Sequence, residues 1–93
     1  MSDPQIHVVM PNVGIDMLAG IRCKIASDAT NNECTVLEVT LQAEQGAGLH
    51  VHQRESELVL VQSGTCTVGD AVQQWPLDVG GMAHFPKQTP HFF

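Results

Sequence analysis

The amino-acid sequence predicts an all-β protein whose antiparallel strands form a sandwich or a barrel. Short runs of alternating apolar and polar side chains recur along the 93 residues, which is the period of a strand with one wet face. Glycine, asparagine and proline turn signals separate these runs at short intervals. No stretch of about 12 residues shows a helical period. Many short strands joined by close turns are typical of antiparallel sandwiches and barrels.

The strand candidates follow one another along most of the chain. In residues 21–25, Arg22 and Lys24 alternate with apolar neighbours, and residues 35–43 repeat this alternation over a longer run. Further strands are expected at residues 49–52, 57–62, 65–68, 71–75, 82–85 and 91–93, and an edge strand is a candidate at residues 6–10. Residues 16–19 are expected to form one helical turn at most.

Composition limits the classes of function. Ten acidic and four scattered basic residues give a net charge of −6, so no basic patch exists for nucleic acid and we expect no nucleic-acid partner. No apolar run approaches the ~20 residues that span a membrane, and no leader-like segment is visible, so we expect a cytoplasmic protein without membrane association. Cys23, Cys34 and Cys66 form no CxxC pair and are expected to be reduced.

The length of the chain suits one domain, and we expect residues 1–93 to form a single barrel domain. A domain of this size buries about 60% of its unfolded surface, so a bound metal or a second subunit would add stability. Leu58 and Leu60 face away from Glu57, which makes their strand apolar on both faces. We therefore expect a homodimer that covers Leu58 and Leu60. The alternative is that N-terminal strands of the same chain cover them.

A possible metal site is indicated by two histidines and a glutamate. His50 and His52 are separated by one residue, so on a strand both imidazoles project from the same face. Glu57 opens the next strand after a turn, and a carboxylate at the head of an apolar face is costly to bury unless a charge compensates it. A metal ion held with the two histidines would compensate Glu57. The alternative is a pair of half-exposed strand histidines beside a solvated carboxylate.

In this order, His50-Val51-His52, Glu57 and Gly64 resemble the first motif of the cupin superfamily. Gly80 and Pro86 resemble its second motif and place His91 where the third histidine belongs. The resemblance covers residues 35–93 and is closest to small single-domain bacterial cupins. It implies a small jelly-roll barrel, also called a double-stranded β-helix. The metal ligands implied by the resemblance are His50, His52, Glu57 and His91.

The sequence departs from the family pattern at two glycine positions and at its end. Glu44 stands where the first motif has glycine, and glycine appears instead at Gly46 and Gly48, so we expect this loop to be locally rearranged without affecting the ligands. Gln88 stands where the second motif has glycine, so its turn must either change its geometry or tolerate strain. Cupins usually continue beyond the third histidine, whereas this sequence stops at Phe93. We expect either that the sequence is a piece of a longer protein or that a partner chain completes the sheet. His91 near the end has an alternative of its own, that of a merely solvated histidine.

Three imidazoles and one carboxylate suit one divalent transition metal, namely iron, manganese, nickel, copper or zinc. The expected pocket is lined by Val59 and Val61, with Phe85 or Trp75 near its mouth, and Glu57 is the candidate proton shuttle. The first functional hypothesis is a metal-dependent enzyme, dioxygenase-like or isomerase-like, that acts on a small-molecule substrate. The alternative is a non-catalytic module that binds or senses a small-molecule ligand. A third hypothesis is a purely structural barrel with an empty site.

Overall fold

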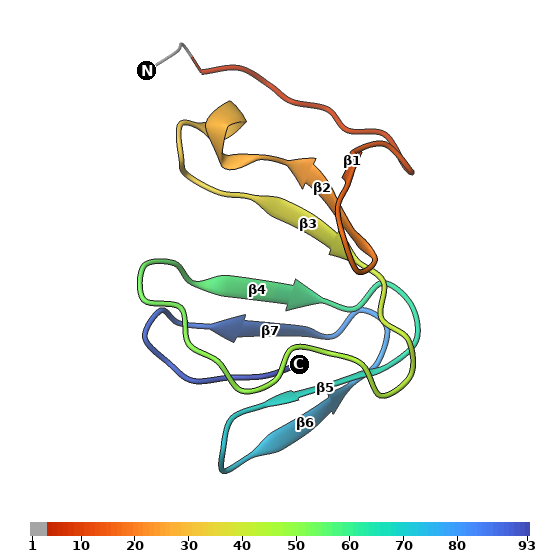
Figure 1. Cartoon of the computed structure of the whole chain (residues 1–93), viewed down its shortest axis with the longest axis vertical. Helices are drawn as coiled ribbons and strands as arrows, with labels where there is room; N and C mark the ends of the chain where they lie inside the picture. The colour runs from red at the N-terminus through yellow and green to blue at the C-terminus, as the bar shows by residue number, and fades with distance from the viewer. Residues whose placement is uncertain (1–3) are drawn as a thin grey trace. The chain divides into compact units, whose positions relative to one another are not determined.

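The computed structural model of this chain describes residues 4–93. The regular elements in this part are seven short strands and one 3₁₀-helix, and every strand pair is antiparallel (Figure 1). This confirms the prediction of an all-β, antiparallel fold. The strands form one three-stranded and two two-stranded sheets, and no continuous ladder closes them into a barrel within residues 4–93. In the same part of the chain, no helix is long and apolar enough to cross a membrane.

The chain packs as two compact units, an N-terminal unit, Met1–Glu44, and a C-terminal unit, Gln45–Phe93. The expectation that the whole chain is one domain stays a prediction, and each unit is described by itself.

The N-terminal unit contains a sheet of three strands, β1 (Ile15–Asp16), β2 (Ile21–Ile25) and β3 (Val36–Val39), in that order. The 3₁₀-helix η1 (Ser27–Thr30) follows β2. Pairs such as Ile21 with Val39 put apolar side chains on one face, because directly opposite residues share a face. The other face carries Arg22, whose Nε donates to Asp16 Oδ1 at 2.9 Å and whose Nη1 lies 3.7 Å from Glu38 Oε1. The N-terminal sheet therefore has one apolar and one charged face.

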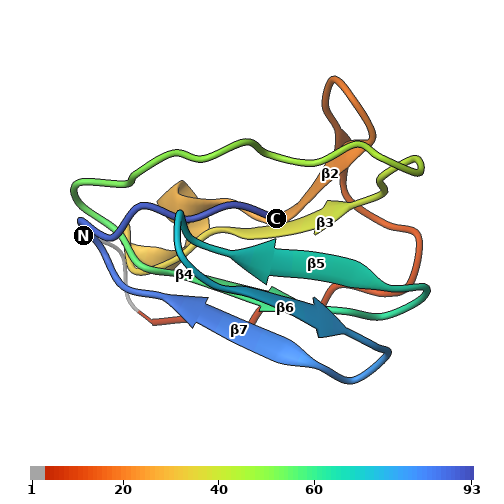
Figure 2. The ribbon, with the colours of Figure 1, turned by 90° about the horizontal axis from the view of Figure 1, so that it is seen from below.

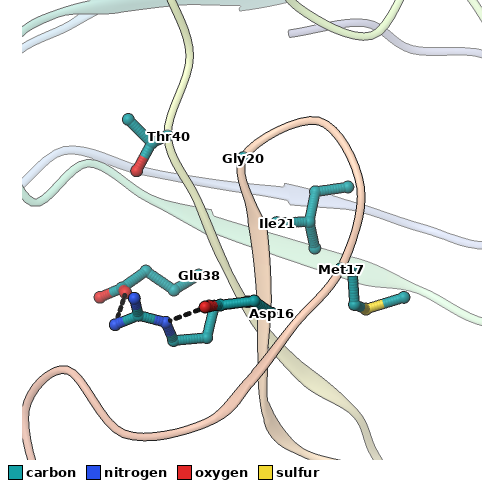
Figure 3. Close-up of a pocket in the computed structure, with 7 residues that line it drawn as sticks. Asp16, Met17, Gly20, Ile21, Glu38 and Thr40 are labelled. Atoms are coloured by element: carbon teal, nitrogen blue, oxygen red, sulfur yellow. Dashed lines mark hydrogen bonds and ion pairs between the residues drawn. The ribbon is translucent and has the colours of Figure 1, made fainter.

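This charged face borders an open pocket in the N-terminal unit (Figure 3). Its lining residues are Asp16, Met17, Gly20, Ile21, Arg22, Glu38 and Thr40. Arg22 is already bound to the two acidic side chains of this pocket, so its charge is satisfied within the sheet. Sequence reasoning did not anticipate this pocket.

The C-terminal unit contains two antiparallel pairs, which Figure 2 shows from below. Strand β4 (Glu57–Leu60) pairs with β7 (Met82–Phe85), and β5 (Cys66–Gly69) forms a hairpin with β6 (Gln74–Leu77). Two isolated bridges, His50 with His91 and Gly69 with Phe92, tie the remaining segments to this unit. The large buried side chains of the described residues all lie in the C-terminal unit, and they are Val61, Val68, Phe85 and His91.

The two faces of the β4–β7 pair differ in exposure. Leu58, Leu60 and Met82 share the outer face, where they are 67%, 52% and 57% exposed. The inner face carries Glu57 and Phe85, which lie directly opposite each other. The outer face is the one from which the sequence predicts a homodimer, and that partner stays a prediction.

Most strand predictions are confirmed, several with shorter bounds. Residues 21–25 form β2 as expected, the runs that begin at residues 35, 57 and 82 contain β3, β4 and β7, and β5 is shifted by one residue from the expected run 65–68. The run at residues 71–75 is displaced, because the strand begins only at Gln74. Asp70 Oδ1 accepts hydrogen bonds from the backbone N–H groups of Val72 and Gln73, both at 2.8 Å, and this turn delays the strand.

The expected strands at residues 49–52 and 91–93 are wrong, since only single bridges form there. His50 pairs with His91, and the next ladder bonds would join His52 with Thr89. These bonds do not form, because the carbonyl of His52 accepts the N–H of Gln88 and the carbonyl of Thr89 accepts from Nδ1 of His91. At residues 6–10 the expected edge strand is also absent, and the carbonyl of Met10 at the end of this segment accepts from the Lys24 ammonium group instead of from a neighbouring strand. The helical turn suggested at residues 16–19 does not form either, and the helix lies at η1 instead.

Candidate metal centre

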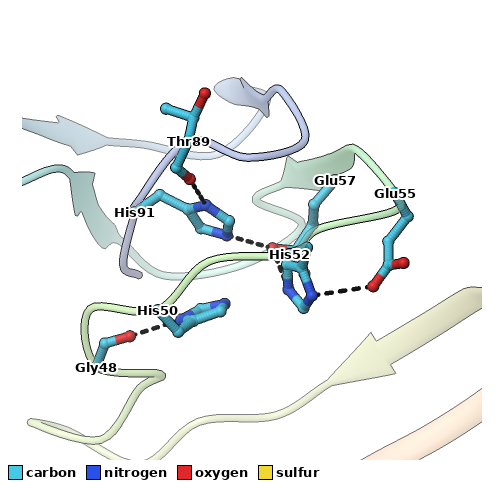
Figure 4. A network of polar contacts seen from close by, with 7 residues as sticks. All are labelled: Gly48, His50, His52, Glu55, Glu57, Thr89 and His91. Carbon is cyan, nitrogen blue, oxygen red and sulfur yellow. Dashed lines mark hydrogen bonds and ion pairs between the residues drawn. The ribbon is translucent and has the colours of Figure 1, made fainter.

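Three histidines and one glutamate of the C-terminal unit converge on one point (Figure 4). His50 and His52 lie in the irregular segment before β4, Glu57 is the first residue of β4, and His91 follows β7. One ligand atom of each residue lies within 4.8 Å of the ligand atoms of the others. The structure therefore brings together the four side chains that the motifs singled out.

The backbone explains why these side chains meet. His50 and His91 exchange both of their main-chain hydrogen bonds, each at 2.9 Å, so they form a directly opposed antiparallel pair. Their rings consequently lie side by side, with centroids 4.4 Å apart. His52 lies two residues beyond His50, and its ring centroid is 4.9 Å from that of His50. The backbone N–H of Gln88 donates to the carbonyl of His52 at 2.6 Å and so connects the segment of His52 to the turn before His91.

His91 is the most enclosed of the four residues. It is 2% exposed, whereas the side chains of His52 and Glu57 are each 32% exposed. The ring of Phe85 stacks on the imidazole of His91, with centroids 4.1 Å apart and planes 5° from parallel. Phe85 is itself buried, so the core holds one face of this imidazole in place. The cluster is thus closed on the His91 side and open to solvent on the side of His52 and Glu57.

Each of the three imidazoles uses Nδ1 for a contact outside the cluster. The acceptors are the carbonyl of Gly48 for His50 at 2.6 Å, the carbonyl of Thr89 for His91 at 2.9 Å and the carboxylate of Glu55 for His52 at 3.0 Å. Carbonyl and ionised carboxylate oxygens only accept hydrogen bonds, so Nδ1 carries the proton in each ring. In a neutral imidazole, the lone pair is then on Nε2, which is the atom available to a metal.

The donor set passes a simple test of fit to a metal ion. Glu57 Oε1 lies 2.9 Å from Nε2 of His91 and 3.8 Å from Nε2 of His52. With Nδ1 already protonated, a direct bond from His91 to Glu57 needs a second proton on a buried ring, whereas a cation between them needs none. Nitrogen and oxygen donors lie about 2.0–2.2 Å from a zinc-like ion, which puts bound donors within about 4.4 Å of one another. The separations in the cluster, up to 4.8 Å, exceed this upper limit by only a few tenths of an ångström.

The chemistry of the donors limits the choice of ion. Imidazole nitrogen with one carboxylate suits iron, manganese, nickel, copper or zinc. Calcium and magnesium prefer oxygen ligands and do not match three imidazoles.

The side chains expected to line a pocket beside the metal lie in three different settings. Val61 and Phe85 are buried in the core at 7% and 8% exposure, and Val59 is half-buried on the inner face of β4. Trp75 on β6 is 48% exposed. Their role as a substrate lining stays a prediction.

The structure also answers the question raised by the two missing glycines. Glu44 and Gln88 have φ angles of +66° and +64°, so both adopt the left-handed conformation that favours glycine. At Gln88 the turn therefore tolerates the strain, and Glu44 is in the same strained conformation. At Gly46, by contrast, a Cβ atom would collide with the carbonyl oxygen of Phe93, so glycine is required there by a close approach of two chain segments.

Sequence reasoning missed two residues that shape the cluster. Glu55 lies in the turn expected between His52 and Glu57, where the sequence indicates no role for it, and Phe85 is expected only near the pocket mouth. Glu55 lies three residues after His52, a spacing that could have suggested a contact. The stack of Phe85 on His91 had no local signal, because these residues meet through the pairing of β7 with β4 and the return of the chain to His50.

Comparison with known proteins agrees with this geometry. The profile of the Cupin domain family matches residues 37–93, which include the whole cluster. Neither the curated proteins nor the solved structures include a match to the chain. Because the matched stretch makes up more than half of the sequence and contains every residue of the candidate centre, the chain belongs to the cupin domain family.

Proposed function

We propose that this cupin binds one divalent transition metal ion through His50, His52, Glu57 and His91 and uses it as an enzyme on a small organic molecule. The observation that carries the proposal is the convergence of these four side chains within 4.8 Å. The Nδ1 contacts support it, because they leave the Nε2 atoms available as donors.

Four protein donors leave one or two positions open on a five- or six-coordinate ion. When bound, the ion supplies Lewis-acid chemistry or, if it is redox-active, chemistry with dioxygen. The enclosed ring of His91 and the stacked ring of Phe85 exclude water from one side. A substrate therefore approaches from the side of His52 and Glu57, where the side chains are partly exposed.

Dioxygenase-like cleavage and isomerisation through an enediolate are the two reaction classes that we propose. Both need a group that can take up and return a proton beside the substrate. Two observations support this role for Glu57, namely that its carboxylate lies in the cluster and that its side chain is about one-third exposed. In this role the carboxylate accepts a proton from the substrate and returns it later in the reaction.

A non-catalytic binding or sensing module is the second candidate. The small size of the C-terminal unit, Gln45–Phe93, favours it, because few loops remain to shape a specific substrate pocket. Fold alone does not decide between the two candidates, since one fold supports many functions.

The first experiment measures metal content in untagged protein that has met neither nickel resin nor chelator. We expect about one transition metal ion per chain, and a His50→Ala variant should lose it. His84→Ala is the matched control, because His84 lies on the outer face of β7, opposite Leu58, and outside the cluster. Equal metal content in all three proteins would contradict the proposed centre.

The second experiment separates catalysis from binding. Metal-loaded protein is supplied with flavonols, diketones and thiols in an oxygen electrode, and with sugars in an isomerisation assay. Turnover that is lost in His50→Ala supports the enzyme. Unchanged small molecule that co-purifies with metal-loaded protein, without turnover of any substrate, supports the binding module instead.

A further inference from the structure

We infer that Glu55 is a positioning residue of the metal centre, which orients His52 and strengthens its donation to the ion. This inference rests on the proposed metal-binding function. It concerns a residue outside the four-residue cluster, in the segment between His52 and β4.

The imidazole of His52 lies between two carboxylates (Figure 4). Glu55 Oε1 is 3.0 Å from its Nδ1, and Glu57 Oε1 is 3.8 Å from its Nε2. A half-turn of the ring would exchange nitrogen for carbon at both places. The bond to Glu55 therefore decides which edge of the ring faces the metal position.

His52 depends on this contact more than the other two histidines depend on theirs. The Nδ1 atoms of His50 and His91 face main-chain carbonyls, whose positions the backbone fixes. His91 is also buried and stacked on Phe85. The side chain of His52 is 32% exposed, and a side-chain carboxylate takes the place that a carbonyl has for the other two.

A carboxylate partner also changes the donor strength of the imidazole. An ionised carboxylate that accepts the Nδ1 proton raises electron density on the ring and makes Nε2 a more basic ligand than a carbonyl partner does. The negative charge of Glu55 further stabilises a cation nearby. Loss of such a partner of a metal ligand typically weakens metal affinity by about 10–100-fold.

The effect on metal binding is separable from an effect on folding. The side chain of Glu55 is 65% exposed, and an exposed ion pair adds little to the stability of a fold because solvent screens it. Substitution of Glu55 should leave the metal-free protein folded as before.

The test titrates the metal-free full chain with Co²⁺ and records both the affinity and the visible d–d absorption spectrum. We expect Glu55→Ala to bind Co²⁺ about 10–100-fold more weakly and with a shifted spectrum. Glu55→Gln keeps an acceptor oxygen but no charge, so its affinity should fall between those of the wild type and Glu55→Ala. Asp78→Asn, the same change of charge at an exposed acid of the same unit outside the cluster, should leave affinity and spectrum unchanged.

Wild-type affinity and spectrum in both Glu55 variants would overturn the inference while leaving the metal centre in place. A fall in affinity of equal size in Asp78→Asn would overturn it too, because the effect would then be one of net charge. If wild-type protein does not bind Co²⁺, or if His50→Ala binds it equally well, the proposed function fails first and the inference fails with it. The melting temperature of each metal-free variant shows that the comparison is made between folded proteins.

Discussion

The two units of this chain are built from similar strand patterns but fix their side chains differently, one by burial in a core and the other by ion pairs at the surface. In the C-terminal unit, His91, Phe85 and Val61 are buried, and the rings of His91 and Phe85 stack on each other. In the N-terminal unit, Arg22 forms ion pairs with the exposed side chains of Asp16 and Glu38. The difference indicates why the candidate centre lies where it does, because a core fixes a side chain more firmly than a screened ion pair does.

The contrast does not come from a lack of apolar residues in the N-terminal unit. Ile15, Val36 and Leu37 lie in its sheet and are 71%, 44% and 47% exposed. Alternation of apolar residues therefore predicts strands in both units, whereas it does not predict how deeply a strand is buried.

The largest change in stability is expected from Phe85→Ala. This substitution removes the buried ring that stacks on His91 and so the feature that distinguishes the C-terminal unit from the N-terminal unit. Deleting a buried phenylalanine ring should lower the free energy of unfolding by about 3–5 kcal/mol, measured by denaturant titration of the metal-free chain. Leu58→Ala is the control on the paired strand β4, and at 67% exposure it should change that free energy by less than about 1 kcal/mol.

Phe85→Leu keeps much of the apolar volume but not the stack on His91. It should cost less stability than Phe85→Ala and should still weaken Co²⁺ binding, because the imidazole is no longer clamped. If Phe85→Leu binds Co²⁺ as tightly as the wild type, burial alone orients His91 and the stack does not.

Much of the centre followed from motif spacing, because spacing constrains which side chains share a face. His50 and His52 lie on one side as the two-residue period predicts, with ring centroids 4.9 Å apart, although the strand expected there is reduced to a single bridge, and Glu57 opens the next strand. The position of His91 came from a resemblance to the cupin motifs rather than from local pattern. Its pairing with His50 is a contact between distant segments, which no local period encodes.

The errors in the strand predictions have a common physical cause. At residues 49–52 and 6–10, the pattern suggested a strand, but the backbone groups find other partners. Beside His91, the carbonyls of His52 and Thr89 accept from the N–H of Gln88 and from the imidazole of His91, and near the N-terminus the Lys24 ammonium group donates to the carbonyl of Met10. The turn after Asp70 likewise shifts β6 by binding backbone N–H groups with a side chain. Other groups thus compete with neighbouring strands for the backbone N–H and C=O groups. Which of them win depends on contacts in three dimensions that the sequence pattern does not contain.

The next largest change in stability is expected at the strained turn before His91. It tests whether the backbone of the C-terminal unit is held in a fixed, strained conformation. Gln88→Gly removes a side chain from a residue at φ +64° and should raise the free energy of unfolding by about 1 kcal/mol. Gln88→Ala is the matched control, because alanine has the same difficulty at positive φ and should give no gain. Equal stabilities of the glycine and alanine variants, measured by denaturant titration, would show that this turn is not strained.

A smaller effect is expected at Asp70, in the turn between β5 and β6. Hydrogen bonds from the backbone N–H groups of Gln73 and Val72 hold the pKa of the Asp70 carboxyl below its ordinary value of 3.8. A lowered pKa in the folded state means that ionised Asp70 stabilises the fold above pH 3.8, and that this contribution is lost as the pH falls through the folded-state pKa.

The measurement compares wild type with Asp70→Asn by denaturant titration, both metal-free, at about pH 5 and at about pH 3. The amide oxygen of asparagine still accepts both hydrogen bonds, but it does not titrate in this range. The stability of the wild type relative to Asp70→Asn should therefore decrease from the higher to the lower pH. A constant difference between the two proteins would contradict a pKa shift at this turn.

The smallest effect is expected in the N-terminal unit, at the ion pair of Arg22 with Asp16. Asp16 raises the pKa of Arg22 further above its ordinary value, mainly through the hydrogen bond and secondly through charge attraction. Arg22 therefore stays charged at every working pH. A double-mutant cycle with Arg22→Gln and Asp16→Asn should give a coupling free energy smaller than the gain from Gln88→Gly. High salt should reduce this coupling further, because exposed charges are screened.

Neither variant should change Co²⁺ affinity, since neither residue belongs to the cluster. A large, salt-independent coupling would instead mean that this unit, too, is held by side chains shielded from solvent, and the contrast between the units would then be wrong.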